Sequence, residues 1–487
     1  MKKNNRNIVI ALMVAMFLAA FEGTVVTTAM PIISRSLNGF DMISWVFSAY
    51  LLTSAISTPV YGKLADLYGR KNILSIGIII FIIGSSLCGI SQNMYQLILF
   101  RAIQGIGAGA ILSIPFAIIG DVFEIEQRAK VQGWLSTVWG IASLIGPFIG
   151  GFLIENLSWN WIFFINVPFG LLSIILLKKN LKEIFGDKKP KIDYLGIVIF
   201  TLAILSFLYG VLIGGEKYGW ISSISIISFF ITVCLLIIFY FVEKRAEDPL
   251  LPFSIFTKSI TIVNVITFLA SAIIMGVEAY MPVYIQNVLG YGPTVSGLTM
   301  APMSITWFLS SFLLAKLIPK YGEKNIISVA TMILIFSNLM LFTMDVNTSL
   351  LSLILYMFIM GFGFGSCFTT LTIVVQSSIN YSKRGAATAS NALVRTLGQT
   401  IGVSVFGSIL NINIVEYFNN IGLKNINPND LYSENGISNV VSSDKIKIAI
   451  TSGIHSIYGI LIIIAILCLF LALMIPKKSQ REVSIKK

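Results

Sequence analysis

The chain has 487 residues, of which 56% are hydrophobic and only 11% are charged. A soluble protein carries roughly 25% charged residues, so this composition, with a mean hydropathy of +0.87, excludes a disordered chain and an ordinary soluble enzyme. The four cysteines lie far apart in apolar runs without a CxxC pair, so no disulfide scaffold or zinc site is indicated. The sequence therefore predicts an all-α polytopic membrane protein.

Apolar runs long enough to cross a bilayer recur along the whole chain, since about 20 residues at about 1.5 Å each span a hydrocarbon core about 30 Å thick. The first run follows Lys2, Lys3 and Arg6, as a secretory signal would. It continues through Glu22 to Pro31 without a clear small-residue cleavage site, so we expect a retained span. The fourteen predicted spans cover residues 8–33, 44–62, 72–91, 95–119, 132–155, 161–177, 193–213, 222–242, 259–287, 294–315, 326–343, 349–376, 386–411 and 449–475.

The basic residues are distributed unevenly between the two sides of the predicted membrane. With the N-terminus inside, 27 of the 34 Lys and Arg residues fall on the cytoplasmic side and five on the outer side, while Arg101 and Arg395 lie within spans. This positive-inside bias explains the net charge of +12 without a nucleic-acid partner. We therefore expect a multi-pass protein of the cell (plasma) membrane with both termini in the cytoplasm.

Two loops indicate that the chain contains an internal repeat. The segment 67–73 matches 320–326 at five of seven positions with an offset of 253, and Arg128 and Arg384 precede later spans at an offset of 256. Spans 1–6 then correspond to spans 9–14, and spans 7 and 8 are an inserted pair, which gives a 6 + 2 + 6 plan. The predicted domains are a six-helix half at 1–178, the inserted pair with its flanking loops at 179–258, and a second half at 259–487 that includes an outer loop at about 412–448 and a cytoplasmic tail.

Two glutamates lie deep in predicted spans, where an unpaired carboxylate is costly. Burial disfavours the charged form of a carboxyl group, so Glu22 is a candidate proton carrier that Arg101 could pair with in one conformation. The alternatives are a static ion pair for Glu22 and an arginine that extends to the outer surface for Arg101. Glu278 is a candidate for recognising cationic substrates, and the alternative is a residue of a solvated outer vestibule.

A polar stripe marks predicted span 13. Asn391, Arg395 and Gln399 follow one another at four-residue steps and therefore share a helix face. Such a stripe in a membrane helix should face a partner or a wet cavity, so we expect these residues to bind substrate. A buried structural arginine is the alternative for Arg395.

Glycine-rich motifs mark places where helices can turn tightly or approach one another closely. The loop at 62–71 carries Gly62, Asp66, Gly69 and Arg70, in which glycines permit a tight turn and Asp66 can cap a helix and pair with basic residues. In span 4 the run 101–109 places Arg101 before Gln104 and three alternating glycines. In span 5 the run 139–151 contains Gly146, Pro147 and Gly150, which combine close helix approach with a kink.

These motifs resemble those of major facilitator transporters, and the first-span run 21–31 resembles that of the fourteen-span drug:proton antiporter family (EmrB/QacA type). The family pattern has aspartate and asparagine where this chain has Glu22 and Thr27, and the span-6 run 159–170 has Asn160 where arginine is commoner. The resemblance implies a major facilitator fold, proton coupling through Glu22 and Arg101, and a conformational switch at Gly62, Asp66, Gly69, Arg70, Gly146, Pro147 and Gly150.

The resemblance implies a proton-coupled multidrug efflux transporter, driven by the proton motive force and able to confer antibiotic resistance, that exports amphipathic and often cationic compounds. The alternative is a proton-coupled exporter or exchanger of one specific metabolite or antibiotic. We expect no cofactor beyond the proton gradient and no metal site, because no phosphate-binding GxxxxGK[ST] motif and no His/Asp cluster in the spans occurs. The expected partners are small-molecule drugs or metabolites, protons and the lipid bilayer, and we expect a monomer without enzymatic activity.

Overall fold

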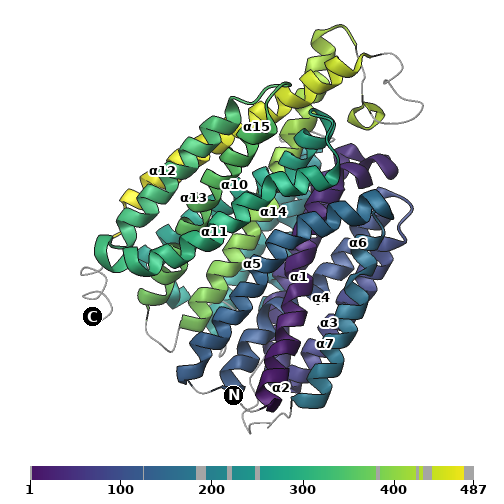
Figure 1. The fold of residues 1–487 in the computed structure, drawn as a ribbon. Coiled ribbons are helices and arrows are strands. Elements are labelled where there is room, and N and C mark those ends of the chain that lie inside the picture. The colour runs from purple at the N-terminus through teal and green to yellow at the C-terminus, as the bar shows by residue number, and fades with distance from the viewer. Residues whose placement is uncertain are drawn as a thin grey trace. The chain divides into compact units, whose positions relative to one another are not determined.

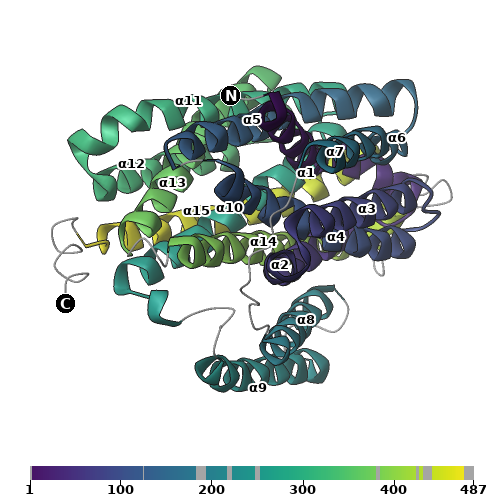
Figure 2. The same cartoon turned by 90° about the horizontal axis from the view of Figure 1, so that it is seen from below.

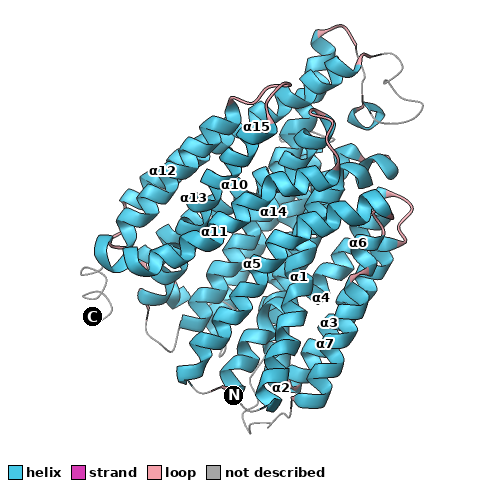
Figure 3. Cartoon of the chain, in the orientation of Figure 1, coloured by secondary structure: helices cyan, strands magenta, loops and turns pink. Residues whose placement is uncertain are grey.

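The computed structural model of the chain is helical in all its long elements (Figure 1). It describes residues 3–123, 125–181, 193–216, 222–246, 253–379, 384–423, 427–431 and 441–476. Within these residues there is no strand (Figure 3). The α-helices are α1 (Lys3–Ser36), α2 (Ile43–Tyr68), α3 (Arg70–Gly89), α4 (Met94–Val122), α5 (Ile125–Asn156), α6 (Trp161–Phe164), α7 (Asn166–Asn180), α8 (Tyr194–Glu216), α9 (Ser223–Arg245), α10 (Lys258–Asn287), α11 (Pro293–Tyr321), α12 (Glu323–Phe342), α13 (Leu350–Ser377), α14 (Arg384–Asn420) and α15 (Ser443–Leu473). Three short 3₁₀ helices lie at Phe40–Met42, Phe253–Ile255 and Pro428–Leu431.

Every predicted span falls on one of these helices, the sixth on α6 and α7 together. Among the described residues, eleven helices are long and apolar enough to cross a membrane. Of the helices on the other three predicted spans, α8 contributes a shorter apolar stretch at Leu195–Phe207, and α5 and α11 contain side chains that are not described. The chain is therefore a multi-pass membrane protein, and the count of fourteen spans stays a prediction.

Two helix boundaries differ from the sequence prediction. The sixth span is interrupted at Ile165, so that α7 begins at Asn166. In addition, α14 continues to Asn420 and α15 begins at Ser443, so the segment between these helices is shorter than the predicted outer loop at about 412–448. Hydropathy marks where a chain leaves lipid, whereas a helix can continue into water because its backbone hydrogen bonds are internal.

The chain divides into two compact units. The first contains Met1–Leu205, Thr232–Leu250 and Gly292–Gly297, and the second contains Ser206–Ile231, Leu251–Tyr291 and Leu298–Lys487. In the first unit α1 packs on α5 and α7, α4 packs on α2 and α3, and α3 packs on α7. In the second unit α10 packs on α14 and α15, α12 packs on α13, and α12 packs on α15. The two units thus share one pattern of helix pairs, as an internal repeat predicts.

Glycine contacts reproduce the repeat residue by residue. A Cβ atom on Gly105 of α4 would collide with the Thr53 hydroxyl and the Tyr50 carbonyl of α2. In the second unit, a Cβ atom on Gly361 of α13 would collide with the Thr306 hydroxyl and the carbonyl oxygen of Met303 on α11. Gly109 and Gly365, four residues further along, make the same approach to Ser57 and Ser310. Backbone contact between these helices therefore occurs twice, at the offsets of the sequence repeat.

We expect the substitution Gly105→Ala to destabilise the protein by about 1–3 kcal/mol, because the added methyl group must push α4 away from α2. Gly120→Ala on the same helix is the matched control, since a Cβ atom there would meet nothing within 4 Å. Thermal unfolding of the two purified variants measures the difference. Equal unfolding temperatures for both variants would show that the α2–α4 contact tolerates a side chain.

The helices α8 and α9 of the predicted inserted pair lie beside each other (Figure 2). Within the first unit, Phe200 and Phe239 pack with their ring centroids 5.0 Å apart. Within the second unit, the Ser206 hydroxyl donates to the carbonyl oxygen of Ser228 over 2.9 Å. The pair is thus one helical hairpin, while the domain boundaries at 178 and 258 and the 6 + 2 + 6 plan stay predictions.

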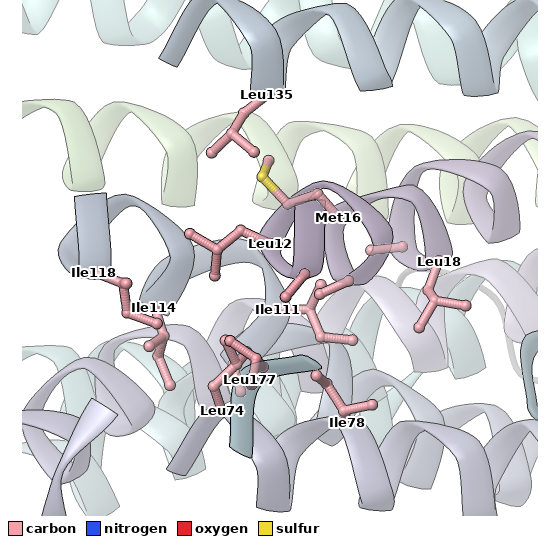
Figure 4. Close-up of a cluster of buried hydrophobic side chains, with 14 of the residues drawn as sticks. Leu12, Met16, Leu18, Leu74, Ile78, Ile111, Ile114, Ile118, Leu135 and Leu177 are labelled. Carbon is pink, nitrogen blue, oxygen red and sulfur yellow. The ribbon is translucent and has the colours of Figure 1, made fainter. Parts of the chain in front are cut away.

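Apolar side chains from neighbouring helices pack against α1 in the first unit (Figure 4). Leu12 and Met16 of α1 belong to one buried cluster with Ile111 of α4, Ile78 of α3 and Leu177 of α7, and Leu135 of α5 joins it. In lipid such clusters stabilise through close packing rather than through exclusion of water. This packing sets the level of the polar residues that follow on α1.

Candidate functional site: a buried ion pair in the first unit

A glutamate and an arginine form an ion pair inside the first unit. Arg101 Nη1 on α4 donates to Glu22 Oε1 on α1 over 2.6 Å, and the two side chains are 1% and 0% exposed. A buried charge is tolerated when it is paired and hydrogen-bonded, so each side chain depends on the other. The full burial also means that Arg101 does not extend to the outer surface, which removes that alternative.

An asparagine binds the second carboxylate oxygen. Asn166 Nδ2 donates to Glu22 Oε2 over 2.6 Å and lies 2.9 Å from the Ser85 hydroxyl oxygen. The Ser85 hydroxyl in turn donates to the carbonyl oxygen of Phe163 over 2.8 Å. Asn166 is the first residue of α7, and it reaches the carboxylate because α7 packs on α1. The packing of α7 on α1 therefore places a hydrogen-bond donor on the carboxylate of the proton-carrier candidate.

Arg101 has further partners besides Glu22. Its Nη1 also donates to Gln104 Oε1 over 2.9 Å, its Nε lies 3.5 Å from the carbonyl oxygen of Val46, and its Cζ lies 4.1 Å from the Tyr50 ring centroid. A guanidinium over a tyrosine face is stabilised by the negative charge density of the ring. Arg101 would therefore keep a polar environment if its bond to Glu22 were broken.

The network joins helices far apart in sequence. Glu22 comes from α1, Tyr50 from α2, Ser85 from α3, Arg101 from α4 and Asn166 from α7. The sequence identified Glu22 and Arg101, and the structure brings them together. The sequence did not identify Asn166, Ser85 or Tyr50 as parts of this network, because nothing in their motifs or helices indicated these contacts. Gln104 lies three residues after Arg101, a spacing that places both on one helix face.

The glycines of α5 pack against α1 directly after Glu22. A Cβ atom on Gly146 would collide with the Thr24 hydroxyl, and one on Gly150 would collide with the Val25 side chain. These two residues therefore fit the close helix approach expected for the span-5 motif, and the helix that approaches is α1. The Pro147 side chain lies outside the described residues.

The predicted switch loop connects α2 and α3. Gly69 has a φ of +92°, which favours glycine, and Gly322 repeats this conformation with a φ of +79° between α11 and α12. Arg70 forms an ion pair with Asp121 at the end of α4 and donates to the carbonyl oxygen of Ala117 over 2.6 Å. By contrast, a Cβ atom on Gly62 would meet no described atom within 4 Å, so the described residues show no close helix approach at this glycine. The side chain of Asp66 lies outside the described residues.

A second set of charged side chains lies in the second unit. Arg395 on α14 is half-buried, with its Cζ 4.4 Å from the Phe368 ring centroid and 5.7 Å from that of Trp307. Glu278 on α10 is also half-buried and interacts electrostatically with Arg395. Asn391 instead donates to Asn264 Oδ1 and Thr267 Oγ1 of α10, over 2.8 and 3.0 Å, and Gln399 is half-buried. The substrate-binding roles of these residues stay predictions.

A metal site finds no support in the described part of the chain, where no group of three or more His, Cys, Asp or Glu side chains could hold an ion. The charged side chains among the candidate residues form one buried pair in the first unit and one half-buried set in the second. Paired charges inside a helical membrane bundle mark ion or substrate pathways.

Helical bundles with a repeated packing pattern and charged residues inside their spans define a polytopic membrane transport protein. The model of the Major Facilitator Superfamily matches residues 12–403. The chain belongs to the Major Facilitator Superfamily, and it is a transporter rather than an enzyme.

Two relatives and one solved structure illustrate the similarity. The chain is 36% identical over 412 residues to the "Multidrug transporter protein MdtP" of Bacillus subtilis, a match that covers 84% of this chain and 76% of that protein. It is 32% identical over 402 residues to the "Multidrug efflux pump SdrM" of Staphylococcus aureus, covering 82% of this chain and 88% of that protein. The inward-facing, unoccupied crystal structure of a bacterial homolog of the human lysosomal transporter Spinster matches with a TM-score of 0.71 at 16% identity, over 99% and 98% of the two chains. This last similarity shows the fold.

Proposed function

We propose that the chain is a proton-coupled multidrug efflux transporter that exports amphipathic compounds by alternating access. The observation that carries the proposal is the fully buried Glu22, bound to Arg101 on one oxygen and to Asn166 on the other. The printed names of the relatives, a multidrug transporter and a multidrug efflux pump, support efflux as the direction. Export or exchange of one specific metabolite or antibiotic is the alternative.

The proposed coupling follows from competition for one carboxyl group. A proton bound to Glu22 removes the negative charge that attracts Arg101, so the protonated and the ion-paired states exclude each other. Arg101 retains Gln104 and the Tyr50 ring when the pair is broken. Because Glu22 is 0% exposed in the ion-paired state, the proton must be exchanged in another conformation. Proton exchange is thereby tied to a change of conformation.

The proposed topology has fourteen spans in a 6 + 2 + 6 plan, in the plasma membrane, with both termini in the cytoplasm and the monomer as the working unit. The Lys and Arg distribution supports the orientation. Helices at all predicted spans support the count. Cysteine-accessibility labelling of loops on both sides in intact cells would test it, and an outer label on the segment between α8 and α9 is the decisive expectation.

The function is tested with everted membrane vesicles that contain the chain. With the vesicle interior acidified, we expect uptake of several unrelated amphipathic compounds, and we expect uptake to stop when the pH gradient is collapsed. Uptake of a single compound would favour the dedicated exporter. Transport that ignores the pH gradient would contradict proton coupling, and uptake only into right-side-out vesicles would contradict efflux.

We expect Asn166→Ala to lower the rate of pH-gradient-driven export by about tenfold or more. The substitution removes a hydrogen bond to a charged group, which contributes about 1.5–3 kcal/mol, and so leaves Glu22 Oε2 without this donor. Asn156→Ala is the matched control, because the exposed Asn156 side chain donates only to the carbonyl oxygen of Phe152 on its own helix. Initial rates in vesicles, normalised to the amount of folded protein, are compared at several pH values. An unchanged rate and pH profile for Asn166→Ala would remove Asn166 from the coupling site.

A further inference from the structure

The single histidine of the chain contacts the turn that connects α12 and α13. His455 lies on α15, and its Nε2 atom is hydrogen-bonded to the carbonyl oxygen of Met344. A carbonyl oxygen can only accept a hydrogen bond, so Nε2 carries the proton of the neutral ring and Nδ1 does not. The Phe342 ring packs beside the imidazole at 5.6 Å, and His455 is half-buried, so the imidazole is not sealed from water.

A tyrosine of α10 binds the next carbonyl group of the same turn. The Tyr284 hydroxyl donates to the carbonyl oxygen of Asp345. Within the turn, the Asp345 N–H donates to Thr348 Oγ1 over 2.7 Å, and the Asn347 N–H donates to Asp345 Oδ1 over 2.8 Å. The contacts from α15 and α10 fall on consecutive residues, so a displacement at one is passed through a rigid peptide plane to the other. The turn at 343–349 therefore ties α10 to α15.

Ionisable side chains lie on this turn and on the helices around it. They are His455 of α15, Asp345 of the turn, Tyr284 of α10, Tyr356 of α13 and Tyr458 of α15. The neighbours on α12 and α14 are uncharged, since Phe342 packs on the imidazole and Asn413 accepts from the Ser456 hydroxyl next to it. Of these side-chain types, only imidazole ordinarily changes its charge between about pH 5 and 8.

We propose that His455 is a pH sensor on the side that the predicted topology places outside, and that its protonation fastens the 343–349 turn to α15. A protonated imidazole still donates from Nε2 to Met344, and a hydrogen bond from a charged donor is roughly twice as strong as one from a neutral donor. The exposed carboxylate of Asp345 adds an opposite charge on the next residue. Because Tyr284 ties the same turn to α10, acid on that side also holds the end of α10 more firmly. This regulation is independent of the proposed proton carrier.

The first unit contains the counterpart of this turn. Residues 90–93 connect α3 and α4, as 343–349 connect α12 and α13. Asn93 caps α4 with its side-chain oxygen, and Ser349, at the repeat offset of 256, caps α13 in the same way. The one histidine of the chain is bound to the other turn, so residues 90–93 provide a reference inside the same molecule.

The first test is a nitrogen NMR titration of the purified full-length protein in lipid nanodiscs, labelled at histidine. Because the chain has one histidine, both ring signals belong to His455 without further assignment. At about pH 8 we expect the tautomer with its proton on Nε2, and acidification to about pH 5.5 should add a second proton at Nδ1. A neutral ring protonated on Nδ1, or a ring that stays neutral throughout, overturns the inference.

The second test is hydrogen exchange of the backbone amides in 343–349. Exchange is expressed relative to that in 90–93 at the same pH, which corrects for the chemical pH dependence of exchange. Acidification over the same range should slow the 343–349 amides about five- to tenfold on this scale, as expected when a neutral hydrogen bond becomes a charged one. No gradient or substrate is needed, so failure of the vesicle experiment would leave this result standing.

His455→Gln is the matched variant, because a glutamine amide can still donate to Met344 but takes up no proton. It should keep the turn folded and lose the acid response, whereas Asp345→Asn should retain most of it, since its side-chain oxygen can still accept from Asn347. Should His455→Gln fail to fold, the wild-type titration and exchange ratio still decide. An acid response that survives in His455→Gln, one that is lost in Asp345→Asn alone, or none in the wild-type chain overturns the assignment to His455.

Discussion

Glu22→Gln is expected to abolish pH-gradient-driven export while leaving a folded protein in the membrane. Glutamine retains the shape of the side chain, and its one carbonyl oxygen can still accept from Arg101, although its amide nitrogen cannot accept from Asn166. It can neither bind nor release a proton. Export against a concentration gradient should therefore disappear, whereas binding of the compounds should persist. Drug-susceptibility panels in an efflux-deficient host, together with vesicle transport, measure the loss.

The control for this result is Glu416→Gln, which makes the same chemical change at an exposed position on α14. It should retain wild-type export. If Glu22→Gln still concentrated compounds under a pH gradient, Glu22 would be half of a static ion pair, and the proton would have to be carried by another group.

Arg101→Gln is expected to destabilise the folded protein by about 3–5 kcal/mol, because Glu22 would keep a buried charge without its cation. The double variant Glu22→Gln/Arg101→Gln should recover most of that stability, since neither charge remains. Neither variant should export. Thermal unfolding of the purified proteins gives the stability order, and vesicle transport gives the activity.

This set of variants distinguishes a structural ion pair from a coupling pair. If the double variant recovers stability but not export, the fold tolerates the loss of both charges, whereas transport requires them. A double variant as unstable as Arg101→Gln would instead show that the pair is needed to hold α1 against α4. Arg245→Gln, at an exposed site, should change neither quantity.

The sequence predicted the helices of this fold well because lipid imposes a simple rule on length and hydropathy. It also singled out Glu22 and Arg101, because a charge within an apolar run is conspicuous, and the structure pairs these two side chains. The repeat was visible in two loops, since the turn at Gly69 and its counterpart at Gly322 both require a left-handed backbone.

What the sequence did not predict were contacts that depend on helix ends and rotation. Nothing in the sequence distinguishes Asn166 from other polar residues, and only the packing of α7 on α1 brings its amide to Glu22. Asn391 shares a helix face with Arg395, yet hydrogen bonds to α10 occupy its amide. Four-residue spacing predicts that residues share a helix face. Which of them can still bind a ligand depends on the hydrogen bonds that the neighbouring helix makes with that face.

The repeated glycine contacts have an evolutionary consequence. They align Arg101 and Gln104, which precede Gly105, with Met357 and Met360, which precede Gly361. Both methionines are 0% exposed, so the same backbone approach accommodates a charged network in one copy and soft apolar side chains in the other. After duplication, each copy inherited the scaffold and was free to lose or acquire chemistry on its own. A division of labour between the two halves, such as the proton carrying proposed for Glu22 and the substrate binding predicted for Arg395, would need only point substitutions and no change of fold.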